Sequence, residues 1–414
     1  MITTTKALRG IGALGAVVLV AAGLTACSST SSSTASGAYT FWDPYPQFDQ
    51  ASDWAKLVDS CGKSAGVTIK RTAFDTSDLT NKALLAGQQD SSPDMLLVDN
   101  PVVSTLVEAG ILTSTKDTGI DVSAADANLM AAGQVKGTSY GMPIGANTLA
   151  LYYNKTVLTA AGVDIASVKD WASLTTALEK VVAAGKKGIT FAGIGTEEGS
   201  FQFLPWYWGS GADLTKLDSP SAVSALTLWT DWVSKGLAPN SVINNTQTTS
   251  WQEFLTGDYA FSENGTWQLA GVKKSGMDYG ILTIPAMDGG PAAAPTGGEF
   301  LTTPVQSDTK RYATSTKIVK CLTSTDNLIK TDTTLSYVAP TKVAQDKQVA
   351  ADAALAPWVE AVRAAKGRTS DDLGIKYPVI SEQMWGAVQK SLSGAATPQA
   401  ALKAAQTAAA SAIG

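Results

Sequence analysis

The residues of this chain that could do chemistry are carboxylates, carboxamides and aromatic rings, because the sequence contains no histidine and has 11 tryptophans. Without histidine, Ser-His-Asp and Cys-His catalysis are excluded, as are zinc sites built on imidazole. Glycoside hydrolysis by two carboxylates needs only Asp and Glu and stays open, although no acid pair is recognisable by its spacing. We expect no catalytic residue, no metal and no cofactor.

Aromatic rings and hydrogen-bonding side chains together suit the binding of a sugar. A pyranose has an apolar face of C–H groups, on which an aromatic ring can stack, and a rim of hydroxyls that hydrogen-bond to carboxylates and carboxamides. A buried polar group left unpaired costs about 1–3 kcal/mol, so such a site rejects ligands that lack the hydroxyls. Several tryptophans lie in predicted loops or at the start of an element, where core packing does not require them.

Most of the candidate ligand-binding residues share such positions. For some of them a structural role is the alternative: Trp42 could seal a lobe, Asp99 could cap a helix, and Glu299 could end a strand in solvent. Asn147 could bridge two lobes, and the aromatic cluster over 203–208 could lie on an amphipathic helix. The candidates are Trp42, Asp43, Tyr45, Asp99, Asn100, Asn147, Phe203, Trp206, Trp208, Asn264, Trp267, Glu299 and Trp385. Four other tryptophans fall on helical stripes and are predicted to be core: Trp54, Trp171, Trp229 and Trp232.

Alternating strands and helices position the first of these residues. An order βαβαβα with continuous apolar strands is typical of a parallel sheet covered by helices on both faces. Ligands bind at the carboxyl ends of such strands, where we find Trp42, Asp43 and Tyr45 after the first strand and Asp99 and Asn100 after the third. The predicted strands are 39–42, 67–71 and 95–98, and the predicted helices are 53–61, 78–86 and 102–109.

Three strand-like segments, at 148–154, 279–285 and 337–341, predict that the chain passes three times between two lobes. On this hypothesis the protein is an α/β protein with two lobes, each built from two stretches of chain. The predicted N-terminal lobe is 39–147 plus 285–337, and the predicted C-terminal lobe is 148–284 plus 338–414.

The first residues predict export. A basic segment precedes an apolar run over 11–22, which is shorter than the roughly 20 residues of a transmembrane helix. Leu24-Thr25-Ala26-Cys27 resembles the lipobox of bacterial lipoproteins, in which the cysteine is lipidated and becomes the first residue. We expect 1–26 to be a signal peptide and 27–38 to be the lipidated Cys27 with a flexible tether, anchored to the outer face of the cytoplasmic membrane. An ordinary cleaved signal with an incidental cysteine is the alternative.

Charge and the remaining cysteines limit the partners and the topology. The net charge of −5 argues against nucleic acid and against an electrostatic grip on anionic lipid. Cys61 and Cys321 remain; in an oxidising exterior such a pair predicts one disulfide, and two buried free thiols are the alternative. A bridge between them would require both to lie in the same lobe.

Four stretches of the chain resemble one protein family. In that family, the first stretch is a strand that ends beside the bound ligand. The second and fourth stretches are segments that cross between the lobes, and the third is a strand-to-helix turn that carries an aromatic residue. They are Ser92-Pro93-Asp94-Met95 with Val98-Asp99; Met142-Pro143-Ile144 with 151–155; 257–261 with Asn264-Gly265-Thr266-Trp267; and 279–285 with Gly297-Gly298-Glu299. With these stretches the chain resembles the bacterial extracellular solute-binding proteins of family 1, the sugar-binding group that includes the maltose-binding protein.

This resemblance implies a two-lobe periplasmic-binding-protein-like fold of type II, in which three crossing segments form a hinge. A monomeric clamp would close on a sugar, most simply an oligosaccharide, and deliver it intact to the permease subunits of an ABC importer. The resemblance places aromatics of the cleft at Trp267 and Trp385. The chain departs from the maltose-binding pattern because the loop after Val98 has no aromatic residue and the loop after Trp42 carries two prolines. A same-fold protein for another solute, or a secreted glycosidase using Asp99 and Glu299, are the competing hypotheses.

Overall fold

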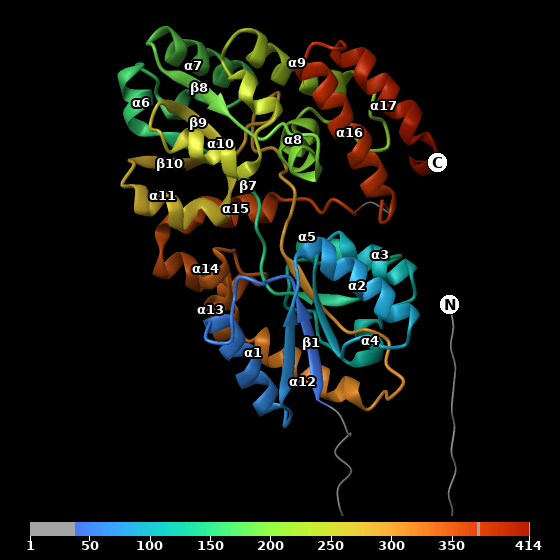
Figure 1. The fold of residues 1–414 in the computed structure, drawn as a ribbon. Coiled ribbons are helices and arrows are strands. Elements are labelled where there is room, and N and C mark those ends of the chain that lie inside the picture. The colour runs from blue at the N-terminus through green and yellow to red at the C-terminus, as the bar shows by residue number, and fades with distance from the viewer. Residues whose placement is uncertain (1–37, 371–372, 414) are drawn as a thin grey trace, which may run out of the picture. The chain divides into compact units, whose positions relative to one another are not determined.

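The computed structural model describes residues 38–370 and 373–413, so the predicted signal peptide, Cys27 and nearly all of the tether lie outside the described residues. Two separate sheets form the centres of two lobes, each covered by helices (Figure 1). None of the described helices is both long enough and apolar enough to cross a membrane.

The first sheet contains five strands in the order β2-β1-β3-β11-β6. As predicted, β1 runs parallel to β2 and β3. The later strand β11 is antiparallel to both β3 and β6, so the complete sheet is mixed. The reason is topological: β11 enters this sheet from the other lobe and therefore runs in the opposite direction. The strands are β1 (Tyr39–Asp43), β2 (Ile69–Ala73), β3 (Met95–Asp99), β6 (Gly141–Pro143) and β11 (Glu299–Thr302).

Successive residues of β3 face opposite sides of this sheet, as the strand period requires. Met95 and Leu97 belong to one buried cluster with helices α1 and α12, whereas Leu96 and Val98 belong to another with α2 and α3. The continuous apolar run of β3 thus serves two cores. The helices of this lobe are α1 (Asp53–Ser64), α2 (Thr76–Gln88), α3 (Val102–Glu108), α4 (Thr115–Thr118), α5 (Ala127–Met130), α12 (Arg311–Leu322) and α13 (Thr325–Leu335), with a small hairpin of β4 (Gln134–Val135) and β5 (Thr138–Ser139).

The second sheet has the order β10-β7-β9-β8, in which β7 is antiparallel to β9 and β10 while β8 is parallel to β9. Its largest buried cluster includes Trp171, Trp229 and Trp232, and Trp54 is buried in the first lobe, so the prediction of four core tryptophans is confirmed. The strands are β7 (Leu149–Asn154), β8 (Lys187–Thr190), β9 (Tyr259–Gly265) and β10 (Tyr279–Leu282). The helices are α6 (Lys155–Ala160), α7 (Trp171–Ala183), α8 (Glu197–Gly209), α9 (Pro220–Ser234), α10 (Gln247–Phe254), α11 (Leu269–Ser275), α16 (Lys376–Leu392) and α17 (Pro398–Ile413).

The predicted crossings at 148–154 and 279–285 form mainly β7 and β10 of the second sheet, and the chain passes between the sheets in the connections 144–148, 283–298 and 336–341. These three connections are joined to one another by backbone hydrogen bonds. Ala146 and Val338 exchange two N–H to carbonyl bonds of 2.8 Å, and Asn147 forms a second bridge with Gly297. Ala146 and Val338 also share a buried cluster with Trp358, on α15. The two remaining helices, α14 (Lys342–Ala351) and α15 (Ala356–Ala364), follow the third crossing. The three crossings therefore meet in one place, where a hinge can act.

Glycine is required where the second crossing approaches the first. A Cβ atom on Gly297 would lie 1.9 Å from the side-chain oxygen of Asn147, and one on Gly298 would lie 2.4 Å from the carbonyl oxygen of Gly145. Gly298 also has φ of +109°, which other residues rarely adopt. These two glycines let β11 begin directly at the crossing, and its first residue is Glu299.

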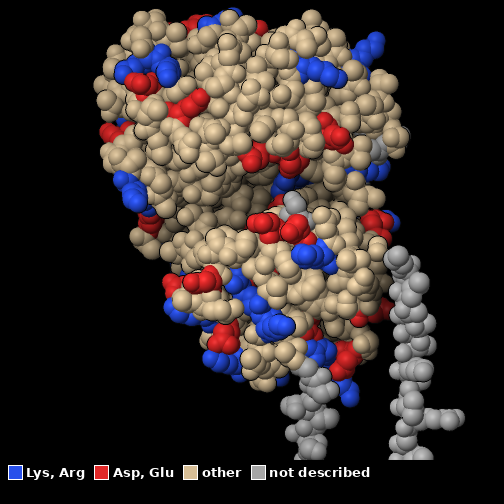
Figure 2. All heavy atoms as spheres, viewed as in Figure 1, with Lys and Arg blue, Asp and Glu red and all other residues tan. Residues whose placement is uncertain are grey.

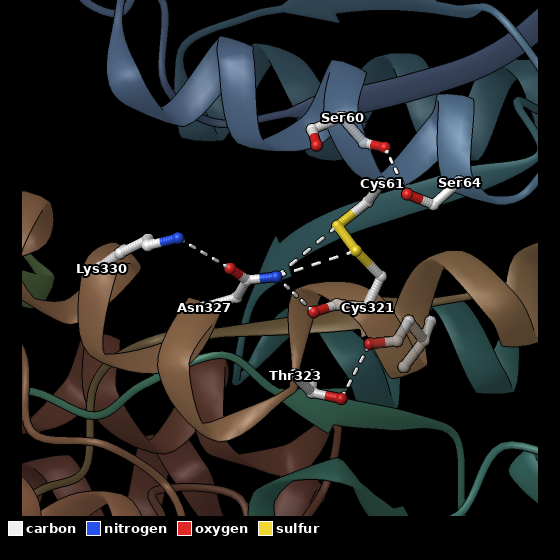
Figure 3. The surroundings of a disulfide bond; sticks show 8 residues. Ser60, Cys61, Ser64, Cys321, Thr323, Asn327 and Lys330 are labelled. Atoms are coloured by element: carbon white, nitrogen blue, oxygen red, sulfur yellow. Dashed lines mark hydrogen bonds between the residues drawn. A yellow bond between two sulfur atoms is a disulfide. The ribbon is translucent and has the colours of Figure 1, made fainter.

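A disulfide joins Cys61 of α1 to Cys321 of α12 across 260 residues of sequence, with 5.6 Å between the two Cα atoms (Figure 3). Both helices lie on the same face of the first sheet, so the bridge stays within one lobe. Asn327 of α13 covers the bond and donates to the carbonyl oxygen of Cys321 at 2.9 Å. Three helices of the first lobe are thereby held together.

We predict that replacing both cysteines, Cys61→Ser with Cys321→Ser, lowers the free energy of unfolding by about 2–5 kcal/mol, because the bond restricts a long loop in the unfolded chain. Urea unfolding followed by tryptophan fluorescence measures the change. Ser64→Ala is the control: it lies on the same helix, its hydroxyl bonds only to the carbonyl of Ser60, and it should change stability by no more than about 0.5 kcal/mol. A double variant as stable as the wild type would contradict the prediction.

Candidate functional site

A cavity of about 430 Å³ lies where elements of both lobes meet. This volume is within the range of small-molecule sites. Figure 2 shows acidic side chains gathered where this face of the protein is hollowed. The lining residues come from the first lobe (Thr76, Asp99, Glu299), from the crossings (Asn147, Gly297, Gly298), from the second lobe (Glu197, Glu198, Phe201, Gln247, Trp267) and from the segment after α15 (Arg368).

Arg368 connects the two sides of this cavity. Its Nη1 donates to Glu197 Oε1 at 2.9 Å, its Nη2 lies 3.5 Å from Asp99 Oδ1, and Nη2 also donates to Asn100 Oδ1 at 3.2 Å. Asp99 and Asn100 follow β3 of the first lobe, whereas Glu197 begins α8 of the second. Arg368 is only 4% exposed, so these bonds act where water screens them little.

Glu299 is the most deeply placed carboxyl of the cavity, with 9% of the residue exposed. Tyr45 donates its hydroxyl to Glu299 Oε2 at 2.6 Å, and Tyr337 donates to Oε1 at 3.3 Å. Burial and the charge of Asp99, its register partner on β3, raise the pKa of Glu299 to about 8. At neutral pH this carboxyl therefore holds a proton and can donate a hydrogen bond as well as accept one.

Asp99 sits in a different environment one strand away. Burial raises its pKa, while the guanidinium of Arg368 and the backbone N–H of Asn100 oppose that rise. Asn100 is itself fixed, because its amide nitrogen donates to the carbonyl of Thr296 at 2.9 Å. The two acids of the first lobe thus differ in their support: Asp99 has a cationic partner, and Glu299 has two phenols.

Aromatic rings line the second-lobe side of the cavity. Trp267 follows β9 and folds back over Gly265, where a Cβ atom would lie 2.1 Å from the indole ring. Its ring centroid is 6.4 Å from that of Phe201, and the guanidinium of Arg368 lies 4.9 Å from the Phe201 centroid on α8. The cation–π contact with Arg368 therefore covers part of the Phe201 ring. Trp267 is half-buried and lines the cavity.

Among the residues predicted from sequence, the structure brings four together at this cavity: Asp99, Asn147, Trp267 and Glu299. Three more hold lining residues in place without lining the cavity themselves. Tyr45 donates to Glu299, Asn100 accepts from Arg368, and Asn264 donates to the carbonyl of Gln247 at 2.9 Å.

Three other candidates are buried away from the cavity, which corrects the expectation that they contact a ligand. Phe203 and Trp206 are 0% exposed and belong to the second-lobe core, because residues 197–209 form a helix. Trp206 donates its indole N–H to Glu263 at 2.7 Å. Asp43 is also fully buried and accepts bonds from Arg71 and from the indole of Trp54, so it serves the structure of the first lobe.

The last three candidates are half-buried but do not line this cavity. Trp42 packs edge-on against Phe74, with 5.3 Å between ring centroids. Trp208 lines a different cavity of about 340 Å³ formed with residues 286–293. Trp385 lies on α16 and is absent from the lining of the interlobe cavity.

Sequence reasoning missed Arg368, Glu197, Phe201 and Gln247. Glu197 and Phe201 lie at the end of α8 that faces the cavity, and the other residues of this helix form the aromatic cluster. The sequence pattern that could have identified this helix start is its acidic first turn. Gln247 begins α10 beside a capping Thr246. Arg368 lies in an irregular segment with no pattern to mark it.

A further cavity of about 490 Å³ opens between α1 and α13, both in the first lobe. It includes the exposed Lys56 and Lys330, and its only aromatic lining residue, Trp54, is 2% exposed. This cavity offers neither an open aromatic face nor groups from both lobes. Of these two cavities, the one that contains Trp267 and groups from both lobes is the candidate functional site.

Two lobes, three crossings and a polar, aromatic cavity between the lobes define a binding protein of the two-lobe class. A family model described as bacterial extracellular solute-binding protein matches residues 56–357. The chain belongs to this family. Among the described residues no group of His, Cys, Asp or Glu is arranged to hold a metal ion.

Curated relatives and a solved structure agree with this membership. The maltodextrin-binding protein of Bacillus subtilis (strain 168) is 27% identical over 308 residues, which are 70% of each chain. A maltooligosaccharide ABC transporter solute-binding lipoprotein of Streptococcus pneumoniae (strain ATCC BAA-255 / R6) is 24% identical over 313 residues, 71% of this chain and 72% of its own. The cyclic alpha-maltosyl-1,6-maltose binding protein of Arthrobacter globiformis superposes with a TM-score of 0.77 at 23% identity, covering 91% of this chain and 99% of that one. The predicted type II fold is confirmed.

We predict that Arg368→Gln lowers the free energy of unfolding by about 3 kcal/mol, because it removes a buried cation that faces Asp99 and leaves that carboxylate without its partner. Urea unfolding of both proteins measures the loss. Arg363→Gln is the matched control, since Arg363 pairs with Asp346 at an exposed position and should matter little. Equal stabilities for the two variants would contradict the role given to Arg368.

We predict that Glu299 makes the protein less stable as the pH rises. The pKa of Glu299 is about 8 in the folded state and has its ordinary value of about 4.5 in the unfolded chain, so between these two pH values the folded protein binds one more proton than the unfolded chain. The stabilisation that the proton on Glu299 gives is complete below about pH 4.5. As the pH rises from there toward 8, the free energy of unfolding falls by up to about 1.4 kcal/mol per pH unit.

Because burial also raises the pKa of Glu263 and Asp332, the test is the difference between wild type and Glu299→Gln. Unfolding measured at pH 5 and pH 8 should show a smaller loss for Glu299→Gln than for the wild type. Glu382→Gln, an exposed glutamate on α16, should keep the wild-type loss. Identical losses in wild type and Glu299→Gln would contradict the assignment.

Proposed function

We propose that this chain is the extracellular carbohydrate-binding protein of an ABC importer, that it captures an oligosaccharide in the interlobe cavity, and that it delivers the sugar unchanged to membrane permease subunits. The observation that carries this proposal is the lining of the cavity. Trp267 offers a face for a sugar ring, while Asp99, Glu299, Asn147 and Gln247 offer acceptors and donors for hydroxyls. Relatives named for binding maltodextrin and maltooligosaccharides support the same ligand class.

The proposed site residues follow from this geometry. We infer that the sugar contacts four residues predicted from the sequence: Asp99, Asn147, Trp267 and Glu299. It also contacts lining residues that the sequence analysis did not identify, among which Gln247 and Arg368 offer polar groups. Rotation of the lobes about the three crossings closes the cavity. The N-terminal lobe is 39–147 plus 285–337 and the C-terminal lobe is 148–284 plus 338–414, with α14 packed against α13 at the boundary.

The proposal extends to how the protein is held. Residues 1–26 are removed as a signal peptide, Cys27 is lipidated, and the mature monomer stays on the outer face of the cytoplasmic membrane beside its permease. Support comes from the lipobox-like Leu24-Thr25-Ala26-Cys27 and from a relative named as a lipoprotein. Metabolic labelling with a radioactive fatty acid would mark the wild type and not Cys27→Ala.

We predict a saturable change in tryptophan fluorescence when maltooligosaccharides of two to seven units are added to the purified protein, with the sugar recovered intact. Calorimetry gives the affinity, and chromatography of the sugar after incubation tests for cleavage. Released products would support the glycosidase hypothesis instead. Binding of phosphorylated or peptide solutes in preference to every sugar would favour a different solute.

We also predict that Trp267→Ala weakens sugar binding by at least about tenfold, because the stacking surface is lost. Trp385→Ala is the control: this tryptophan is also half-buried but lies outside the cavity lining, and its loss should change affinity less than twofold. The reverse ranking would show that the ligand binds elsewhere in the protein.

A further inference from the structure

We propose that the carbohydrate bound in the interlobe cavity carries a protonated amine, and that Glu299 is the residue that binds this ammonium group. This inference rests on the proposed function and narrows its ligand class from neutral sugars to amino sugars or amine-bearing oligosaccharides. Three observations lead to it: the balance of charge around the cavity, the use already made of its arginine, and the partners of Glu299.

The charge of the lining is unbalanced. Four acidic side chains line the cavity, of which Glu299 holds a proton at neutral pH, and Arg368 is the single cationic residue among the lining residues described. Asp99 and Glu299, the two lining acids of the first lobe, lie on the neighbouring strands β3 and β11 and are paired in register. The acids are Asp99, Glu197, Glu198 and Glu299. A ligand that brings a positive charge complements this lining, and one that brings a negative charge does not.

The charge of Arg368 is already used by the protein. It lies between Asp99 and Glu197 and also donates to Asn100, so its two terminal nitrogens have partners on both lobes. Its Nε is buried and has no hydrogen-bond partner among the described residues, so it is enclosed by the protein. The charge of Arg368 is therefore directed to Asp99 and Glu197, and Glu299 is left without a counter-charge.

Among the residues that the structure describes, Glu299 accepts side-chain hydrogen bonds only from neutral donors. The hydroxyls of Tyr45 and Tyr337 hold its two oxygens, and the nearest charged group acting on it is another carboxylate, Asp99. The raised pKa of Glu299, about 8, has the same origin: a buried carboxyl that lacks a cation keeps a proton instead. An ammonium group in hydrogen-bond contact with Glu299 would supply the missing charge and displace that proton.

The aromatic lining is compatible with such a ligand. Phe201 already faces the guanidinium of Arg368, whereas the ring of Trp267 is free to cover the C–H face of a sugar. A sugar stacked on Trp267 presents its substituents in the ring plane, where a primary amine can replace one hydroxyl without added bulk. The site thus binds the sugar ring by stacking and selects the amine by charge.

The test compares maltotriose with maltotriose derivatives in which one hydroxyl, at the 2, 3 or 6 position of a terminal unit, is replaced by a primary amine. Isothermal titration calorimetry at pH 7 and low salt measures each affinity for wild type, Glu299→Gln and Glu382→Gln. We expect at least one amine derivative to bind wild type and the exposed control Glu382→Gln at least tenfold more tightly than maltotriose. Glu299→Gln should reduce this preference to less than threefold, and urea unfolding of the variant beside the wild type shows that it is folded.

A second readout needs no variant. Calorimetry of the preferred amine in buffers with different heats of ionisation should show release of close to one proton per ligand at pH 7, because the ammonium replaces the proton on Glu299. Binding without proton release, or an amine preference that survives in Glu299→Gln, would overturn the role of Glu299. If maltotriose binds and no amine derivative binds more tightly, the inference fails and the proposed sugar-binding function stands. If no sugar in the series binds, both fail.

Discussion

The guanidinium of Arg368 is the interaction on which the cavity depends. A buried cation is tolerated only where acids and hydrogen-bond acceptors surround it, and here those groups come from opposite lobes: Asp99 and Asn100 on one side, Glu197 on the other. Glu197 is fixed in turn by the hydroxyls of Tyr377 and Ser381. One charged group therefore orients two carboxylates that line the site and joins the lobes across it.

The hinge explains how such a contact can exist. Short backbone bridges, Ala146 with Val338 and Asn147 with Gly297, fix the crossings to one another, and two glycines allow that approach. Glu299 begins β11 immediately after these glycines, so the hinge itself places the deepest carboxyl of the cavity.

Much of this fold could be predicted from local sequence, because strand and helix patterns are local properties. β1, β3 and their loops were predicted well, and Asp99 and Glu299 were identified from their places at strand ends. The cluster at 203–208 was harder to interpret, since aromatic residues on a buried helix and in a binding loop look alike; Pro205 within α8 did not prevent the helix. Arg368 could not be predicted, because its role is defined only by acids that lie about 170 and 270 residues earlier in sequence. Long-range ion pairs leave no local pattern.

The division between occupied and free polar groups determines what the cavity can recognise. Most of its polar atoms are held by the protein: Asn100 by Thr296 and Arg368, Glu198 by the backbone of Gln247, and Glu197 by three donors. Because these side chains are already held in place, they need little rearrangement when a ligand binds. Glu299 is the lining acid whose printed donors are both neutral hydroxyls, so it still lacks a counter-charge. A ligand that presents a positively charged donor to Glu299 supplies that charge, and a purely hydroxylic sugar does not.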